Sequence, residues 1–141
     1  MVDPDVFDRR LAKLEELLRD LRALARVDRE RFLADRGVQA QAERWLQLAA
    51  ECALDLAHHL IASRGWAVPS TYREAFQILE REGVLTPALC VRMQGWAGLR
   101  NVLAHLYMEV DHRRLFDVLV RDLDSLEDFA AAIARAAESV P

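Results

Sequence analysis

The chain has 141 residues and a formal net charge of −4 at pH 7, with 52% hydrophobic residues but only 5 Gly and 4 Pro. The length suits a single domain over residues 1–141 with one sizeable core, and the hydrophobic content excludes a disordered chain. The acidic balance excludes a globally basic nucleic-acid binder but not a local basic cleft, and the scarcity of Gly and Pro favours an all-α fold.

The first half of the sequence predicts two long helices. Apolar residues recur in alternating steps of four and three, which predicts an amphipathic helix over residues 4–35, capped by Asp3 and ended by Gly37. A second helix, rich in Leu and Ala, is expected over residues 38–63, with Gly65 at its C-terminal cap.

The second half predicts three further helices. Thr71 starts a short third helix with capping-box spacing, and Thr86 followed by Pro87 starts a fourth that reaches the neighbourhood of His105. Asp111 is a good N-cap for the last helix. These elements predict an up-and-down bundle of four longer helices with one additional short helix.

The sequence shows no signal for a membrane or for a disulfide. No apolar run approaches the ~18 residues of a membrane span, and the N-terminal stretch MVDPDVFDRR is polar and acidic, unlike a signal peptide. Cys52 and Cys90 lie in apolar helical contexts without a CxxC pair, which favours two buried thiols in a reducing compartment. We therefore expect a cytoplasmic protein with no membrane contact.

The segment GWAGLRNVLAHLYMEVDHRR places Arg100, Asn101, His105 and Tyr107 close together in an otherwise apolar stretch. On a straight helix Asn101 and His105 share a face, and the long side chain of Arg100 can swing toward a phosphate held near His105. Histidine moves protons near neutral pH, arginine stabilises charge on phosphate oxygens, and asparagine can orient the imidazole or the substrate. The set therefore suits phosphodiester cleavage, with no metal or other cofactor if the RNA 2′-OH is the nucleophile.

The alternative is an ordinary helix end with solvated polar tips, since a bare R-x4-H pattern arises easily by chance. The longer string RNVLAHLY, however, fits R-x4-H-x-Y with Asn directly after Arg. It resembles the HEPN superfamily and, within it, the HepT-like toxins of prokaryotic toxin–antitoxin pairs. The segments ERWLQLAAECALDLAHHLIA, PSTYREAFQILEREGVL and GLRNVLAHLYMEVD are similar to successive segments of that family, in its order, and cover most of residues 40–120.

The resemblance implies a helical, HEPN-like bundle that acts as a metal-independent endoribonuclease. It implies a homodimer in which two R-x4-H motifs line one composite cleft, and a partner nucleotidyltransferase antitoxin of the MntA type that transfers AMP to the motif tyrosine. Carried onto this chain, Arg100 and His105 would be catalytic, Asn101 supporting and Tyr107 the AMP acceptor. The substrate would be RNA, with no cofactor.

A second candidate site lies on the second helix, where Glu51, Asp55, His58 and His59 have spacing that metal ligands can use. The alternative is a polar stripe on an amphipathic helix, and no other helix offers an obvious His or Cys to complete a metal site. Arg44 and Glu51 lie seven residues apart on one face and could border the composite cleft.

Basic residues follow the cap of the last helix. Arg113 and Arg114, next to His112, are candidate contacts for RNA phosphates, although a solvated first turn is an equal alternative. The tryptophans could stack bases, but core or dimer-interface packing is the favoured role for each of them: Trp45, Trp66 and Trp96.

Two other functions remain open from the sequence alone. The same bundle could be a non-catalytic interaction subunit of a nucleotidyltransferase complex that binds nucleotide or RNA without cleaving it. It could also be a plain helical adaptor, since a fold does not determine a function.

Overall fold

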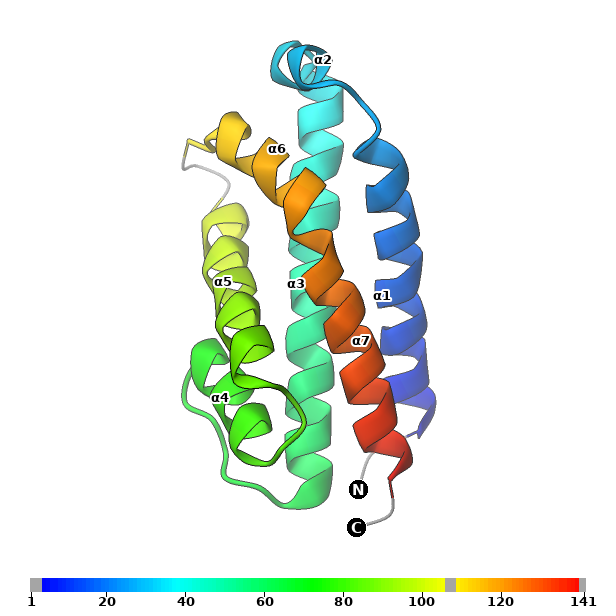
Figure 1. Cartoon of the computed structure of the whole chain (residues 1–141), viewed down its shortest axis with the longest axis vertical. Coiled ribbons are helices and arrows are strands. Elements are labelled where there is room, and N and C mark those ends of the chain that lie inside the picture. Colours follow the sequence, from blue (N-terminus) through cyan, green and yellow to red (C-terminus); the bar gives the residue numbers. More distant parts are fainter. Residues whose placement is uncertain (1–3, 106–108, 140–141) are drawn as a thin grey trace.

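The structure is a computed structural model that describes residues 4–105 and 109–139. Figure 1 shows the four longest helices running alternately up and down, with short helices at both ends of the bundle. Within the described residues the chain has no strand and seven helices: α1 (Pro4–Leu24), α2 (Arg29–Ala34), α3 (Arg36–Arg64), α4 (Tyr72–Arg81), α5 (Pro87–Ala104), α6 (His112–Arg121) and α7 (Leu123–Glu138). The predicted all-α fold is confirmed.

Helix α3 is the centre of the bundle and packs against α1, α4, α5 and α7. Its buried residues recur in steps of three and four, which turns one wide apolar face toward these neighbours. Phe76 of α4 and Phe129 of α7 meet edge to face, with ring centroids 5.8 Å apart. All seven helices contribute to one contiguous cluster of buried hydrophobic side chains.

Local capping chemistry determines where most helices begin. Five helices start at a residue whose side-chain oxygen accepts a backbone N–H of the first turn: Asp28, Asp35, Thr71, Thr86 and Asp111. At the other end of α3, Gly65 adopts φ 70°, a left-handed conformation that glycine accepts without steric strain. The helix starts predicted at Thr71, Thr86 and Asp111 and the end predicted at Gly65 are confirmed.

The prediction of a single helix over residues 4–35 is wrong, because α1 ends at Leu24 and α2 is a separate helix. The Asp28 carboxylate accepts the backbone N–H of Arg31 at 2.8 Å, which favours a new helix start in the middle of the predicted one. Gly37 does not end a helix either, since it lies in the first turn of α3, which Asp35 caps. The predicted cap Asp3 lies outside the described residues.

The last predicted helix is also divided, at Asp122, into α6 and α7. The hydroxyl of Ser125 donates to the carbonyl of Asp122 at 2.6 Å, and such local hydrogen bonds compete with regular helix geometry. The apolar spacing continues across the bend, since Leu119, Leu123 and Leu126 are all buried. Periodicity therefore gives no sign of this change in helix direction.

The structure also bears on the expectations for membrane-spanning segments and for the two cysteines. In the part of the chain that the structure describes, no helix combines the length and the apolar character needed to cross a membrane. Cys52 and Cys90 are buried free thiols, as predicted, and burial raises the pKa of each thiol above its usual value. Both thiols therefore have little thiolate character near neutral pH.

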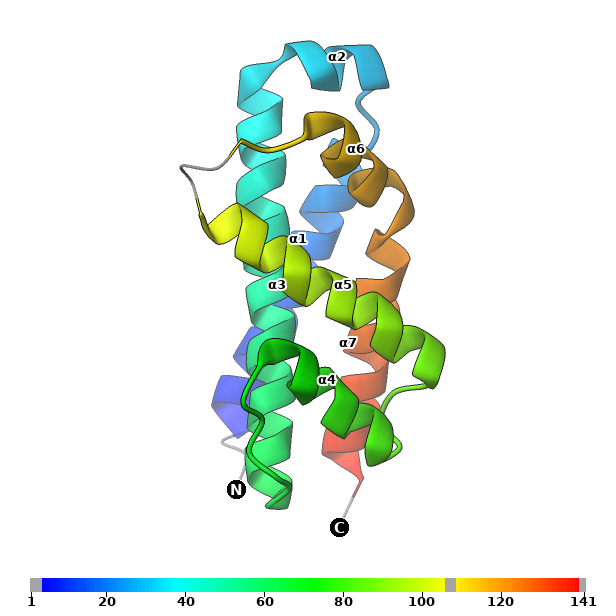
Figure 2. The same ribbon diagram turned by 90° about the vertical axis from the view of Figure 1, so that its left-hand side faces the viewer.

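Helix α5 is fixed by the neighbours on its buried side, and Figure 2 shows it crossing in front of α3 with α4 beside it. The Trp96 indole is buried and its Nε1 donates to Ser125 Oγ of α7 at 2.8 Å. This hydrogen bond satisfies the one polar atom of the indole in the core, and it fixes the rotation of α5 about its own axis.

Replacing Ser125 with Ala should lower the free energy of unfolding by about 1–3 kcal/mol, because the buried indole N–H would lose its acceptor. Equilibrium unfolding in urea measures this loss. In the double variant Trp96→Phe/Ser125→Ala the orphaned donor is absent, so its loss should be smaller than the sum of the two single losses. Strictly additive losses would show that the two side chains are not coupled.

Candidate functional site

The R-x4-H residues lie at the C-terminal end of α5. Arg100 and Asn101 are in the last two turns of the helix, and His105 is the C-cap, with φ −93° and ψ 79° and its backbone N–H on the carbonyl of Val102. Asn101 and His105 are exposed, whereas the Arg100 side chain is only 27% exposed. The helix therefore presents the motif where it leaves the bundle.

Arg100 is held by side chains from two other helices. Its Nε lies 3.5 Å from Glu51 Oε1 of α3, and its guanidinium carbon lies 5.1 Å from the centroid of the Tyr72 ring of α4. Its Nη1 donates to Asn101 Oδ1 at 3.4 Å. An arginine lodged between a carboxylate and an aromatic ring has a defined direction while part of its guanidinium remains accessible.

The residues around Arg100 are themselves oriented. Glu51 accepts a hydrogen bond from Gln47 Nε2 at 3.2 Å, which fixes the carboxylate that faces Arg100. His58 donates from Nδ1 to the carbonyl of Leu54 at 2.8 Å, and its ring meets Tyr72 edge-on at 6.1 Å. A cavity beside these groups is lined by His58, Tyr72 and Asn101, together with residues of the loop before α4.

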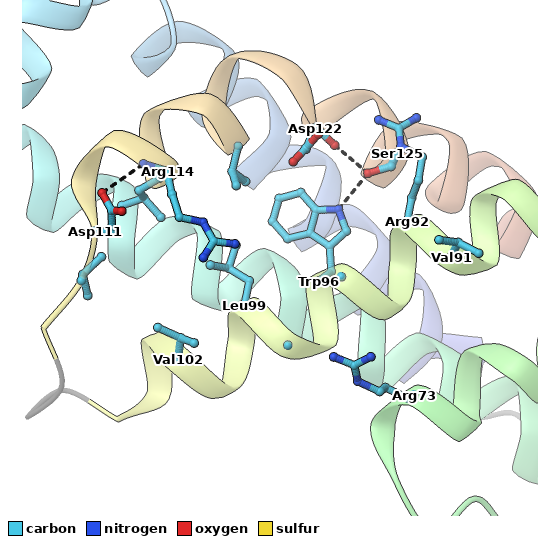
Figure 3. Close-up of a pocket in the computed structure, with 15 residues that line it drawn as sticks. Arg73, Val91, Arg92, Trp96, Leu99, Val102, Asp111, Arg114, Asp122 and Ser125 are labelled. Carbon is cyan, nitrogen blue, oxygen red and sulfur yellow. Dashed lines mark hydrogen bonds between the residues drawn. The ribbon is translucent and has the colours of Figure 1, made fainter.

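The structure separates the two arginines predicted to bind phosphate. Arg114 lines a large cavity between α5 and α6, and Figure 3 shows its side chain reaching toward Leu99 of α5. Arg113 lines a different cavity together with Leu33 and His112. His112 Nε2 lies 3.4 Å from Glu43 Oε2, so this histidine links α6 to α3.

The second candidate set on α3 is divided among separate contacts. Glu51 pairs with Arg100, Asp55 pairs with Arg10 of α1 at 3.2 Å, and His58 bonds the backbone of its own helix. Across residues 4–105 and 109–139, no group of three or more His, Cys, Asp or Glu side chains is placed to hold a metal ion. Of this set, Glu51 and His58 belong to the surroundings of Arg100.

The tryptophans, expected in the core or at a dimer interface, all pack against the core of this chain. Trp96 is buried, and Trp45 and Trp66 are partly buried against the core. Arg44 is exposed on α3, two turns before Glu51. The predicted AMP acceptor Tyr107 lies outside the described residues.

The sequence patterns did not indicate two residues that lie near the motif. Tyr72 covers Arg100, and Arg73 lies between the cavity at Asn101 and the larger cavity at Arg114. The capping pattern at Thr71 predicted where α4 begins but not which neighbour its first turn contacts. Only the packing of α4 on α5 reveals that contact.

The chain is similar to known ribonucleases in sequence. The model of the family described as ribonuclease HepT-like matches residues 14–133. A tRNA nuclease HepT of Aphanizomenon flos-aquae is 29% identical over 82% of this chain and 78% of its own length. An mRNA nuclease HepT of Shewanella oneidensis is 25% identical over 86% of this chain and 92% of its own length.

Solved structures share the fold. The tri-AMPylated HEPN toxin of Shewanella oneidensis, solved in complex with the MNT antitoxin, matches with a TM-score of 0.85 at 23% identity, over 96% of this chain and 99% of the toxin. A cytosolic protein of Bacillus subtilis, YutE, matches with a TM-score of 0.80 at 23% identity, over 95% of this chain and 90% of that protein.

Replacing Arg100 with Ala should leave the fold intact and change the free energy of unfolding by about 1 kcal/mol or less, since partly exposed ion pairs and cation–π contacts contribute little. Urea unfolding of Arg100→Ala, Glu51→Gln and the double variant gives the coupling between the two charges, expected at about 0.2–1 kcal/mol. A loss above about 3 kcal/mol in Arg100→Ala would instead identify this arginine as a structural residue.

Proposed function

The chain belongs to the ribonuclease HepT-like family, and from this premise we propose that it is the toxin of a toxin–antitoxin pair and cleaves RNA with Arg100 and His105. One observation carries the proposal. Arg100 is oriented by Glu51 and Tyr72 but keeps an accessible guanidinium, at the same helix end as Asn101 and His105. This arrangement leaves an oriented guanidinium available to an anion that binds beside His105.

The reaction follows from the functional groups of the site. The RNA 2′-oxygen attacks the neighbouring phosphorus, the bond from phosphorus to the 5′-oxygen breaks, and a 2′,3′-cyclic phosphate and a 5′-hydroxyl result. A histidine accepts the 2′-OH proton and a histidine donates a proton to the 5′-oxygen. Arg100 stabilises the charge that develops on the phosphate oxygens, and Asn101 orients Arg100 through its side-chain oxygen.

A homodimer would improve this chemistry. In one chain, His105 would have to serve as both the base and the acid of a single turnover. Two chains related by a two-fold axis would supply two imidazoles and two guanidinium groups to one cleft. We therefore include a homodimer with a shared cleft at the ends of the two α5 helices in the proposed function.

The proposed antitoxin is a nucleotidyltransferase of the MntA type. The similar toxin of Shewanella oneidensis is tri-AMPylated in its complex with the MNT antitoxin. In this chain the acceptor would be Tyr107, whose phenolic oxygen would form a bond to the α-phosphorus of ATP as pyrophosphate leaves. The attached AMP would bring negative charge and bulk close to His105, where an RNA phosphate must enter.

His105→Ala and Arg100→Ala should each reduce RNA cleavage by about 100-fold or more, because one variant loses the proton carrier and the other the charge that stabilises the transition state. Arg100→Lys should retain part of the activity, since it keeps the charge without the planar fork. Cleavage of a labelled RNA measures these effects. Asn101→Ala should cause a smaller loss.

The same assay tests the nucleophile and the absence of a metal requirement. Cleavage should persist in EDTA and stop when the 2′-OH at the cut is replaced by hydrogen. Activity that vanishes in EDTA and returns with a divalent ion would contradict the mechanism. An intact wild-type protein that binds RNA without cleaving it would instead favour a non-catalytic binding subunit.

Co-expression with the cognate nucleotidyltransferase should add AMP to Tyr107 and silence the ribonuclease. Tyr107→Phe should keep at least part of the ribonuclease activity and escape the modification, because the phenol is a weak base at neutral pH and has no assigned part in the proton transfers. Intact-mass and peptide spectra locate the added group. A silenced complex with unmodified Tyr107 would show that the partner inhibits in another way, most simply by covering the cleft.

A further inference from the structure

Three arginines from three different helices line one cavity of about 540 Å³. Figure 3 shows Arg73 reaching from α4 toward α5, Arg92 rising from α5 beside Ser125, and Arg114 reaching from α6 toward Leu99. We call the cavity bordered by Arg73, Arg92 and Arg114 the arginine groove. All three residues are exposed.

The arginine groove has more arginines than carboxylates in its lining. Among the described residues, none of the three arginines forms an ion pair, although other arginines of the chain do. Asp111 and Asp122 also line the cavity, so three guanidinium groups are set against two carboxylates, and one oxygen of Asp111 is occupied by backbone N–H groups at the start of α6. The groove thus retains positive charge in a chain that is acidic overall.

The floor of the groove is apolar and permits a close approach. Val91 and Val102 of α5 are 69% and 40% exposed. A Cβ added to Gly95 would meet nothing within 4 Å, so packing inside this chain does not require glycine there. A Cβ at Gly98 would lie 3.3 Å from Arg73 Nη2, so this glycine gives room for the arginine to cross α5.

Arg73 connects the groove to the proposed active site. It lines both the arginine groove and the smaller cavity that contains Tyr72 and Asn101. Along α5, Arg92 lies 13 residues before His105, which corresponds to about 20 Å of helix. Arginine side chains are therefore distributed over a distance longer than one nucleotide of an RNA strand, starting from the motif.

Resting on the proposed ribonuclease function, we propose that the arginine groove binds the phosphate backbone of single-stranded RNA next to the scissile bond. Arg73 contacts the phosphate nearest the active site, and Arg92 and Arg114 contact phosphates farther along the strand. The apolar floor receives sugars or bases without selecting a sequence. Positively charged grooves with apolar faces are typical of proteins that bind single strands.

Charge argues against a second copy of this chain as the occupant. A two-fold axis through the groove would bring three arginines and two carboxylates together with the same set of the other copy, so that positive charge is in excess across the interface. Facing like charges disfavour such an interface, whereas a phosphate backbone complements them.

The test is RNA binding by the His105→Ala protein, which holds the strand without cutting it. A fluorescently labelled oligouridylate long enough to cross the groove is the probe, with binding followed by anisotropy over a range of salt concentrations. Arg73→Gln, Arg92→Gln and Arg114→Gln are compared with Arg29→Gln, which removes an exposed arginine of α2. The Arg→Lys variants at the same three groove positions keep the charge.

Each Gln substitution in the groove should remove about one phosphate contact. The slope of log K against log salt should fall by about 0.7, which corresponds to about fivefold weaker binding at 0.1 M salt. The Lys variants and Arg29→Gln should bind nearly as the parent does. Circular dichroism should show unchanged helical content in every variant.

Two results would overturn the proposal that the groove binds RNA. The first is unchanged binding and salt slope in all three Gln variants, while the wild-type protein cleaves RNA. The second is a drop in molecular mass by light scattering that accompanies weaker binding, which would identify the groove as a protein–protein contact. If the wild-type protein does not cleave RNA but the His105→Ala protein binds it through these arginines, the proposed ribonuclease function is wrong and the proposed RNA binding by the groove is supported.

Discussion

The burial of one side of α5 is the constraint on which the position of the candidate site depends. Met93, Trp96 and Leu103 face the core, and the Trp96 indole is tied to α7 through Ser125. Each residue advances the helix by about 100°, so this buried side also sets the direction of every other side chain of α5. A rotation by one residue would separate Trp96 from Ser125 and would also move Arg100 away from Glu51 and Tyr72, so the core hydrogen bond and the site depend on the same rotation of α5.

Arg100 is oriented by contacts that are individually weak. The Arg100 and Glu51 side chains are 27% and 33% exposed, so water screens their attraction, and the Nε of Arg100 is buried without a well-aligned hydrogen bond. A guanidinium held in this way has a fixed direction, but its hydrogen-bonding capacity is only partly used. Exchanging part of the contact with Glu51 for a contact with a phosphate therefore costs little, which suits an arginine that binds an anion transiently.

The helix caps and the family could be predicted from the sequence, whereas the helix breaks and the contacts between helices could not. The caps at Thr71, Thr86 and Asp111 depend on residues within one turn, and the family predicted from RNVLAHLY is confirmed by the match to the HepT-like ribonucleases. The breaks before α2 and at Asp122 were missed, because buried apolar residues keep their spacing while the chain bends. The contact of Tyr72 with Arg100 joins two helices, and no spacing within one helix encodes it.

Net charge is a poor guide to anion binding in this fold because the charges are unevenly paired. Several carboxylates are matched by arginines within the bundle, as Asp55 is by Arg10 and as Asp124 and Glu127 are by Arg22. The field of such pairs decays over a short distance and is screened further by salt. The three arginines of the groove beside α5 form no such ion pairs among the described residues and outnumber the two carboxylates of its lining, so the local charge is positive although the total is −4. An acidic chain can in this way present a basic surface at one helix, which is the condition that binding a polyanion requires.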